Sequence, residues 1–155
     1  MSIDTSNQFF IMKETYFAHI EYANNIIYPI IAVELTSTIE GSVPRLYIAW
    51  FDTGATNTLL SKRVFDSNKF VEVGTTPAAG PIKGQEAEEL KKCRALFRIT
   101  GTDNSEFKDT VDVAVSNKDF NGYDMLLGLD ILSNAIFCYD GFNKVRQISF
   151  KKTEH

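Results

Sequence analysis

Apolar and polar residues alternate with a period of two along most of this chain, and this pattern constrains the fold more than any other feature. The clearest runs are rich in β-branched and aromatic residues and span positions 30–35, 46–51, 93–99, 111–115 and 145–150. Such runs are typical of half-buried strands. Glycine, proline and polar clusters separate them, so the sequence predicts short strands with close turns in an all-β barrel or sandwich.

Helix is predicted at two short segments only. They are 61–67, where Ser61 can act as the N-cap, and 129–135, which follows Gly128. Segment 86–92 has a helix-forming composition, but it lies between a glycine-bearing turn and a strand-like run. We therefore interpret it as the returning arm of a β-hairpin.

Size and charge exclude several classes of protein. The chain has 155 residues, which fits one domain, and 44% of them are hydrophobic, enough to form a buried core. A net charge of −4 and the lack of any basic block argue against a nucleic-acid partner. Charged residues interrupt the apolar positions of segment 1–28, so we expect no signal peptide, no membrane partner and a soluble, cytoplasmic protein.

Cysteine and histidine are scarce. Cys93 and Cys138 are too few for a disulfide framework; one bridge between them is neither required nor excluded, and we interpret both as free, buried thiols. His19 and His155 have no second ligand or nucleophile motif beside them. We therefore predict no metal site and no cofactor, and the sequence gives little support to Ser-His or Cys-His catalysis.

The most informative residue is Asp52, which ends the apolar run 46–51 and is followed by Thr53, Gly54 and Ala55. A carboxylate at the end of a buried strand is costly unless it accepts hydrogen bonds, and these three residues offer backbone N–H groups with little side-chain obstruction. Asp52 is therefore a candidate catalytic residue. The alternative is a plain turn, since Asp and Gly are common turn formers.

A second segment strengthens the catalytic interpretation. Positions 123–132 read as a short apolar strand that ends at a glycine and leads into a helix. In combination with Asp52–Ala55, this order of segments resembles the retropepsin-like (retroviral-type) aspartic proteases over positions 30–150. The string 124–130 is especially similar to the retroviral-like protease domain of the DNA-damage-inducible ubiquitin-shuttle proteins. The resemblance implies a closed, all-β, single-lobe barrel with one short helix after the second motif.

Aspartic proteolysis requires two carboxylates that share one proton, and this chain contains Asp-Thr-Gly once. The symmetric solution is a homodimer in which two copies of Asp52 meet on the two-fold axis and activate a water that hydrolyses a peptide bond. By the resemblance, Thr53 bonds the partner subunit's loop, Gly54 lets a backbone N–H approach the carboxylate, and Ala55 keeps the substrate floor low. Three further residues would form the scaffold beneath this loop: Leu126, Leu127 and Gly128.

The resemblance also implies a flap that closes over a polypeptide substrate. Its expected residues are Ala79, Gly80, Pro81, Ile82, Lys83 and Gly84. The two glycines would allow the backbone to move and to bond the substrate main chain. An extended substrate would then lie between flap and floor, recognised by β-type hydrogen bonds.

The chain departs from the viral pattern at two positions. Asn57 and Leu129 stand where retroviral proteases usually have an acidic residue and an arginine, so the salt bridge that those residues form cannot form here. Segment 1–28 lies outside the resemblance. Because it is rich in apolar residues, we interpret it as an arm packed on the domain or on the dimer edge, with the protease domain at 29–155. The alternative is a precursor segment that the enzyme itself cleaves off.

Two other functions stay open at this stage. The first is a catalytically inactive retropepsin fold that binds peptides or supports assembly. The second is a small all-β ligand-binding or structural protein in which Asp52 merely begins a turn. A strictly monomeric protein would exclude the dimeric protease, because one copy cannot form the pair of carboxylates.

Overall fold

The computed structural model describes residues 11–15, 30–78, 88–101, 106–140, 142 and 145–151. Within them the chain forms ten strands and two short helices. Each of the five runs with period-two alternation lies inside a strand, so the all-β prediction is confirmed. Among these residues no helix has the length and apolar character needed to cross a membrane.

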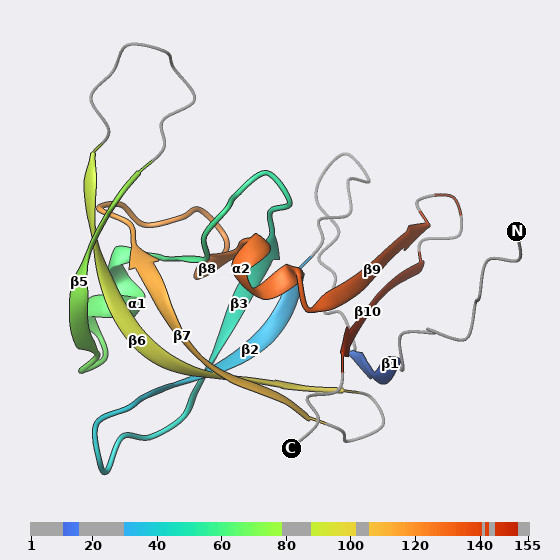
Figure 1. Ribbon diagram of the computed structural model, residues 1–155, viewed down its shortest axis with the longest axis horizontal. Coiled ribbons are helices and arrows are strands. Elements are labelled where there is room, and N and C mark those ends of the chain that lie inside the picture. Colours follow the sequence, from blue (N-terminus) through green and yellow to red (C-terminus); the bar gives the residue numbers. More distant parts are fainter. Residues whose placement is uncertain are drawn as a thin grey trace, which may run out of the picture.

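Seven strands form one sheet that closes on itself (Figure 1). In the order in which they pair, they are β2 (Ile30–Ser37), β3 (Arg45–Phe51), β8 (Met125–Leu127), β4 (Leu59–Leu60), β7 (Glu106–Val115), β6 (Glu89–Thr100) and β5 (Val71–Pro77). An additional antiparallel pairing of β2 with β6, from Glu34↔Arg98 to Ser37↔Ala95, closes a barrel of six strands. Strand β5 extends from β6 outside this ring. The expected closed barrel is thus confirmed.

Two parallel pairings inside the barrel bring distant segments of the chain together. Strand β3 pairs with β8 in the register Ala49↔Met125 to Phe51↔Leu127. Strand β4 pairs in parallel with β7 and antiparallel with β8. As a result, the residues that follow β3 lie next to the residues that follow β8.

A second sheet of three strands lies at one side of the barrel (Figure 1). Its strands are β1 (Ile11–Thr15), β10 (Val145–Lys151) and β9 (Ala135–Asp140), all antiparallel. Aromatic contacts join this sheet to the barrel: the ring centroids of Phe107 and Phe150 are 4.2 Å apart, and those of Phe51 and Phe137 are 5.2 Å apart. The division of the chain at residue 28 stays a prediction.

The two helices form where the sequence predicts them. Helix α1 (Lys62–Asp66) begins after Ser61, whose hydroxyl oxygen accepts from the backbone N–H of Val64 at 3.4 Å. Helix α2 (Leu129–Leu132) follows Gly128 and is shorter than the predicted 129–135, because the chain enters β9 at Ala135. The predicted returning arm is confirmed from Glu89 onward, where β6 pairs with β5.

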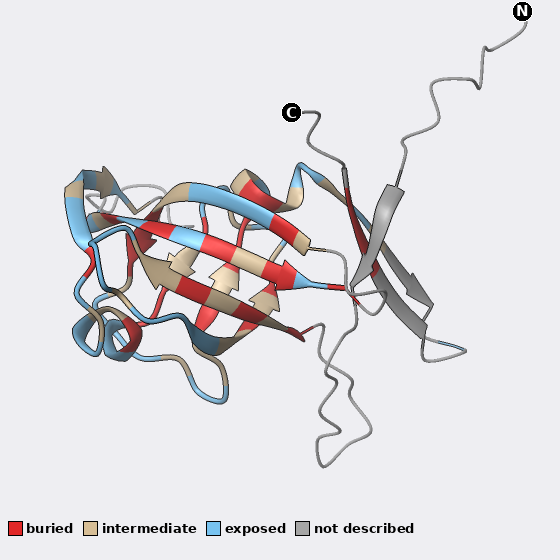
Figure 2. Ribbon diagram, turned by 90° about the horizontal axis from the view of Figure 1, so that it is seen from below, coloured by how far each residue is buried: buried red, intermediate tan, exposed pale blue. Residues whose placement is uncertain are grey.

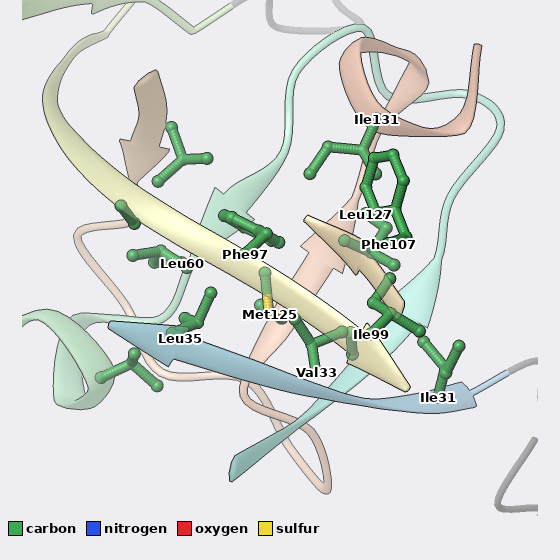
Figure 3. Close-up of a cluster of buried hydrophobic side chains, with 14 of the residues drawn as sticks. Ile31, Val33, Leu35, Leu60, Phe97, Ile99, Phe107, Met125, Leu127 and Ile131 are labelled. Carbon is green, nitrogen blue, oxygen red and sulfur yellow. The ribbon is translucent and has the colours of Figure 1, made fainter. Parts of the chain in front are cut away.

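The core fills the barrel with side chains from the inward positions of its strands. Figure 2 shows buried and less buried residues alternating along the barrel strands, and Figure 3 shows inward side chains of β2, β6 and β8 meeting. Cys93 belongs to this core and is a free thiol, as expected, whereas the side chain of Cys138 lies outside the described residues. The largest fully buried side chains of the barrel strands and helices include Ile31, Val33, Leu35, Leu60, Val64, Phe97, Ile99, Met125, Leu127 and Ile131.

Candidate active site

Asp52 stands directly after β3, at the start of a loop that runs from 52 to 58. Its backbone N–H donates to the carbonyl of Leu127 at 3.0 Å, which continues the β3–β8 pairing by one residue. Its carboxylate oxygen Oδ1 accepts from the N–H of Gly54 at 2.9 Å, and its carbonyl accepts from the N–H of Ala55 at 3.1 Å. The carboxylate is therefore held by its own loop, directly after the buried Phe51 at the end of β3.

The tip of this loop is open to solvent. Thr53 and Gly54 are exposed, while Asp52 and Ala55 are half-buried. A Cβ atom on Gly54 would lie 3.2 Å from Oδ1 of Asp52, tighter than an ordinary van der Waals contact. Glycine at this position lets the N–H reach the carboxylate without crowding it.

The three residues expected as scaffold form the end of β8 and the start of α2. Leu127 is fully buried and bonds the backbone of Asp52, and Leu126 is half-buried opposite Leu59. A Cβ atom on Gly128 would lie 2.5 Å from the carbonyl carbon of Asn57 and 2.8 Å from the nitrogen of Thr58. Only glycine therefore allows the two backbones to approach this closely.

Further backbone bonds join the loop to the turn that begins α2. The N–H of Leu129 donates to the carbonyl of Ala55 at 2.8 Å, and the N–H of Asp130 donates to the carbonyl of Thr56 at 3.1 Å. With the Asp52–Leu127 bond, these contacts attach the loop to segment 127–130 at three points. The geometry of the carboxylate thus depends on a segment from the far end of the sequence.

Sequence reasoning missed two polar residues beneath the loop, Thr58 and Asp130. Thr58 is fully buried, and both its N–H and its hydroxyl donate to the carboxylate of Asp130, at 2.9 and 2.7 Å. The two residues are 72 positions apart, so no local pattern connects them. The one available signal was the place of Asp130 in the string 124–130.

A third carboxylate, that of Asp124, fixes the entrance to β8. Its Oδ2 accepts from the N–H of Ile48 at 2.8 Å, and its Oδ1 accepts from the Arg63 guanidinium at 2.6 Å. Its own N–H donates to the carbonyl of Ile48 at 2.8 Å. Asp124 therefore ties β8 to the middle of β3 and to α1, and serves the framework of the site.

Three aromatic residues gather near this entrance. The ring of Tyr123 stacks on Phe120 at 5.0 Å and meets Trp50 edge-on at 4.9 Å. Burial raises the pKa of the Tyr123 phenol, and the negative charge of Asp52 raises that pKa further. The phenol thus lies within the electrostatic field of the candidate catalytic carboxylate.

The predicted flap can be followed only at its base. Strands β5 and β6 pair as far as Pro77↔Glu89, and the N–H of Ala78 donates to the carbonyl of Glu88 at 2.6 Å. The hairpin expected there is thus present up to these residues. The six predicted flap residues lie outside the described residues: Ala79, Gly80, Pro81, Ile82, Lys83 and Gly84.

Other features of the described chain are separate from Asp52. A surface pocket of about 410 Å³ lies between the β2–β3 turn and the segment after α1, and Glu40, Arg45 and Lys69 are among its lining residues. No member of the 52–58 loop lines it. In the parts of the chain that the structure describes, no group of three or more His, Cys, Asp or Glu residues is arranged to hold a metal ion.

Comparison with known proteins gives similarity in structure only. No protein-family model and no curated protein sequence matches the chain. The chain is similar to the protease of EIAV in complex with the inhibitor HBY-793, at 20% sequence identity and a TM-score of 0.38, covering 74% of this chain and 92% of that one.

Two further solved structures are similar to the chain. One is a retropepsin-like aspartic protease from Rickettsia conorii, at 18% identity and a TM-score of 0.42, with 88% of this chain and 93% of that one covered. The other is the retroviral protease-like domain of Ddi1 from Leishmania major, at 15% identity and a TM-score of 0.41, with 78% and 94% covered.

Proposed function

We propose that this protein is an aspartic endopeptidase that works as a homodimer. The observation that carries the proposal is the Asp52 carboxylate, which directly follows the buried Phe51 at the end of β3, accepts the Gly54 N–H at 2.9 Å and lies beside an exposed loop tip. A carboxylate that only began a turn would not need the close backbone packing at Gly128. That packing supports a loop whose geometry has to be exact for chemistry.

The proposed dimer supplies the second carboxylate. One chain holds one Asp-Thr-Gly, whereas general acid and general base catalysis by this route requires two carboxyl groups in near contact. Thr53 and Gly54 are exposed at the loop tip, where a second copy could approach. A two-fold axis through this tip would place the two copies of Asp52 face to face.

In the proposed reaction, one Asp52 is ionised and its counterpart is protonated. The ionised member takes a proton from a bound water, which attacks the carbonyl carbon of the scissile peptide bond, while the protonated member donates its proton to the carbonyl oxygen. The C–N bond of the resulting diol then breaks as the carboxyl that took the proton from water gives it to the leaving amine, and the other carboxylate removes a hydroxyl proton, which restores the pair. Two carboxyl groups roughly 3 Å apart titrate as a pair, so activity should show a bell-shaped dependence on pH. The substrate would be an extended polypeptide held between the loop and residues 79–84.

The test is the variant Asp52→Asn, which keeps the size of the side chain and removes its acid. We expect cleavage of a reduced, unfolded protein substrate to fall by roughly 10²–10⁴-fold, with the mass in solution still that of a dimer. The matched control is Asp109→Asn, at an exposed position on β7, which should cleave at the wild-type rate.

Three results would contradict the proposal in different ways. If the Asp52→Asn variant cleaved the substrate at the wild-type rate, this carboxylate would be excluded from catalysis. A strictly monomeric wild-type protein would exclude the shared pair. A wild-type dimer that binds unfolded peptides without cleaving them would support the inactive peptide-binding alternative.

A further inference from the structure

The side chain of Asp130 is engaged entirely beneath the candidate catalytic loop. Its Oδ1 accepts from the Thr58 hydroxyl at 2.7 Å and from the Ile131 N–H at 2.9 Å. The N–H of Thr58 lies 2.9 Å from both Oδ1 and Oδ2. Every one of these partners is a donor, so the site matches an acceptor-only carboxylate.

The Thr58 hydroxyl forms a directed chain of hydrogen bonds. It accepts from the N–H of Gly128 at 3.0 Å and has one hydrogen of its own, which is directed to Asp130. The chain therefore runs from Gly128 through Thr58 to Asp130, and each group in it has a partner. Because Thr58 is fully buried, removing any member leaves a buried polar group without its bond.

The same residues close the loop that carries Asp52. The loop begins with the Asp52 N–H bonded to Leu127 and ends at Thr58, which is bonded to Asp130. Between these ends, the Asp130 N–H bonds the carbonyl of Thr56. Asp130 thus contacts the loop through both its backbone and its charged side chain.

We propose that Asp130 is a positioning residue for the reaction: through Thr58 it holds the 52–58 loop in the conformation that presents the Asp52 carboxylate. This inference rests on the proposed protease function. It assigns to Asp130 no contact with substrate or water. Removing these directional hydrogen bonds should lower the reaction rate, because displacing a catalytic group by about 1 Å can reduce the rate roughly 100-fold.

The kinetic test compares Asp130→Ala and Thr58→Val with Thr58→Ser. The first two remove the carboxylate and the hydroxyl, and we expect kcat to fall by roughly 10- to 100-fold while KM changes little, at a temperature where both variants are folded. Thr58→Ser keeps the hydroxyl and should recover most of the lost rate. The double variant Asp130→Ala/Thr58→Val should lose no more than the worse single variant, because the two residues act as one unit.

Asp130→Asn gives a milder variant should the alanine variant fail to fold. Its amide oxygen can keep the contacts of Oδ1. Its NH₂ group replaces Oδ2 and therefore faces the N–H of Thr58, so that two hydrogen-bond donors oppose each other. We expect a loss of kcat smaller than that of Asp130→Ala. Asp109→Ala, at an exposed position of β7, is the control. An unchanged kcat in both folded Asp130 variants would overturn the proposal.

Hydrogen exchange separates this proposal from the proposed function. In Asp130→Ala the backbone amides of 53–58 should exchange at least about tenfold faster than in wild type, with the β6–β7 amides unchanged. Hydrogen exchange does not depend on catalysis. If the wild-type protein showed no Asp52-dependent cleavage, the proposed protease function would be refuted, but the exchange measurement would still decide whether Asp130 holds the loop. Unchanged exchange at 53–58 would overturn the inference even in an active enzyme.

Discussion

The barrel wall at β6–β7 and the support of the 52–58 loop are stabilised in different ways. Along the wall the two strands pair without interruption from Lys92↔Ala114 to Thr100↔Glu106, and alternate side chains such as Phe97 enter the core with 0% exposure. Around the loop, contact depends on a few hydrogen bonds and on Gly128. The wall is stabilised by buried area, which many sequences can supply, whereas the loop depends on particular atoms.

Stability and precise geometry therefore depend on different parts of the molecule. Burial of apolar surface is non-directional, so the wall tolerates small changes in shape and still folds. Hydrogen bonds at 2.7–3.0 Å to Asp130 and Thr58 fix directions, so the loop has one arrangement or loses its bonds.

The largest expected effect is at the loop. In Gly128→Ala the added Cβ would lie 2.5 Å from backbone carbon of Asn57, and only separation of the two segments relieves the clash. We expect the free energy of unfolding to fall by about 3 kcal/mol and Asp52-dependent cleavage to be lost. Denaturant unfolding and a cleavage assay measure the two effects.

Gly41→Ala is the control for Gly128→Ala, because Gly41 lies in open space with a φ of +78°. Its cost is that of a left-handed alanine, roughly 1–2 kcal/mol, without a steric clash. Equal losses in the two variants would mean that the close approach at Gly128 does not set the loop geometry.

The next effect concerns the wall and appears at high pH. Burial, with smaller contributions from the charges of Asp112 and Glu72, raises the pKa of the Cys93 thiol from 9.0 to about 12. The thiol therefore stays protonated in the folded protein while it ionises in the unfolded chain. The stability that this protonated thiol provides is complete below pH 9 and is lost as pH rises towards 12.

The measurement is the free energy of unfolding between pH 9 and 11, in a Cys138→Ala background that leaves one thiol. The parent should lose up to about 1.4 kcal/mol more per pH unit than the matched Cys93→Ala variant. Parallel curves for the two proteins would show that Cys93 is not protected by the wall. The comparison uses slopes, so the cavity left by the substitution does not affect it.

The smallest effect is on the outer face of the wall. Arg94 bonds Asp112 through two nitrogens at 2.7 and 2.9 Å, and both side chains are partly exposed. Since exposed ion pairs contribute little, Arg94→Ala should lower the thermal midpoint by no more than roughly 3 °C. A shift as large as that of Gly128→Ala would mean that charges, rather than buried area, stabilise the wall.

The pH dependence of this small effect follows from Asp112. The hydrogen bond and charge of Arg94 lower the pKa of Asp112 below its ordinary 3.8. The contribution of the pair is therefore present above that ordinary value and is lost as pH falls through the lowered pKa. Wild type and Arg94→Ala should converge in thermal midpoint at the acidic end of a titration.

Alternation made five strands predictable from sequence, namely β2, β3, β6, β7 and β10, because each carries its own signal. Alternation along 93–99 depends only on neighbouring residues, and β6 contains that run with the expected face inward. Helix α1 was predictable for the same reason, since Ser61 caps it locally. The end of α2 was not, because Ala135 pairs with Phe150 in β10, a contact that lies outside the helical segment itself.

The site was predictable only in part. Asp52 and Gly54 stand two positions apart, so their hydrogen bond could be inferred from the tripeptide. Thr58 and Asp130 could not be connected, because a buried threonine and an acid in a helical first turn look ordinary when read separately. The requirement for glycine at position 128 likewise follows from the backbone of Asn57, which no local pattern identifies.

Local sequence is sufficient to specify short strands and an acidic residue at the end of an apolar run in an Asp-Thr-Gly context. Both are local properties, set by side-chain period and by the conformations open to a few adjacent residues. Tertiary structure alone decided which segments support that acid. The parallel pairing of β3 with β8 brings 127–130 against 52–58. Only then do Thr58, Gly128 and Asp130 form one hydrogen-bonded unit, because such bonds require atoms within about 3 Å, whatever their separation in the chain.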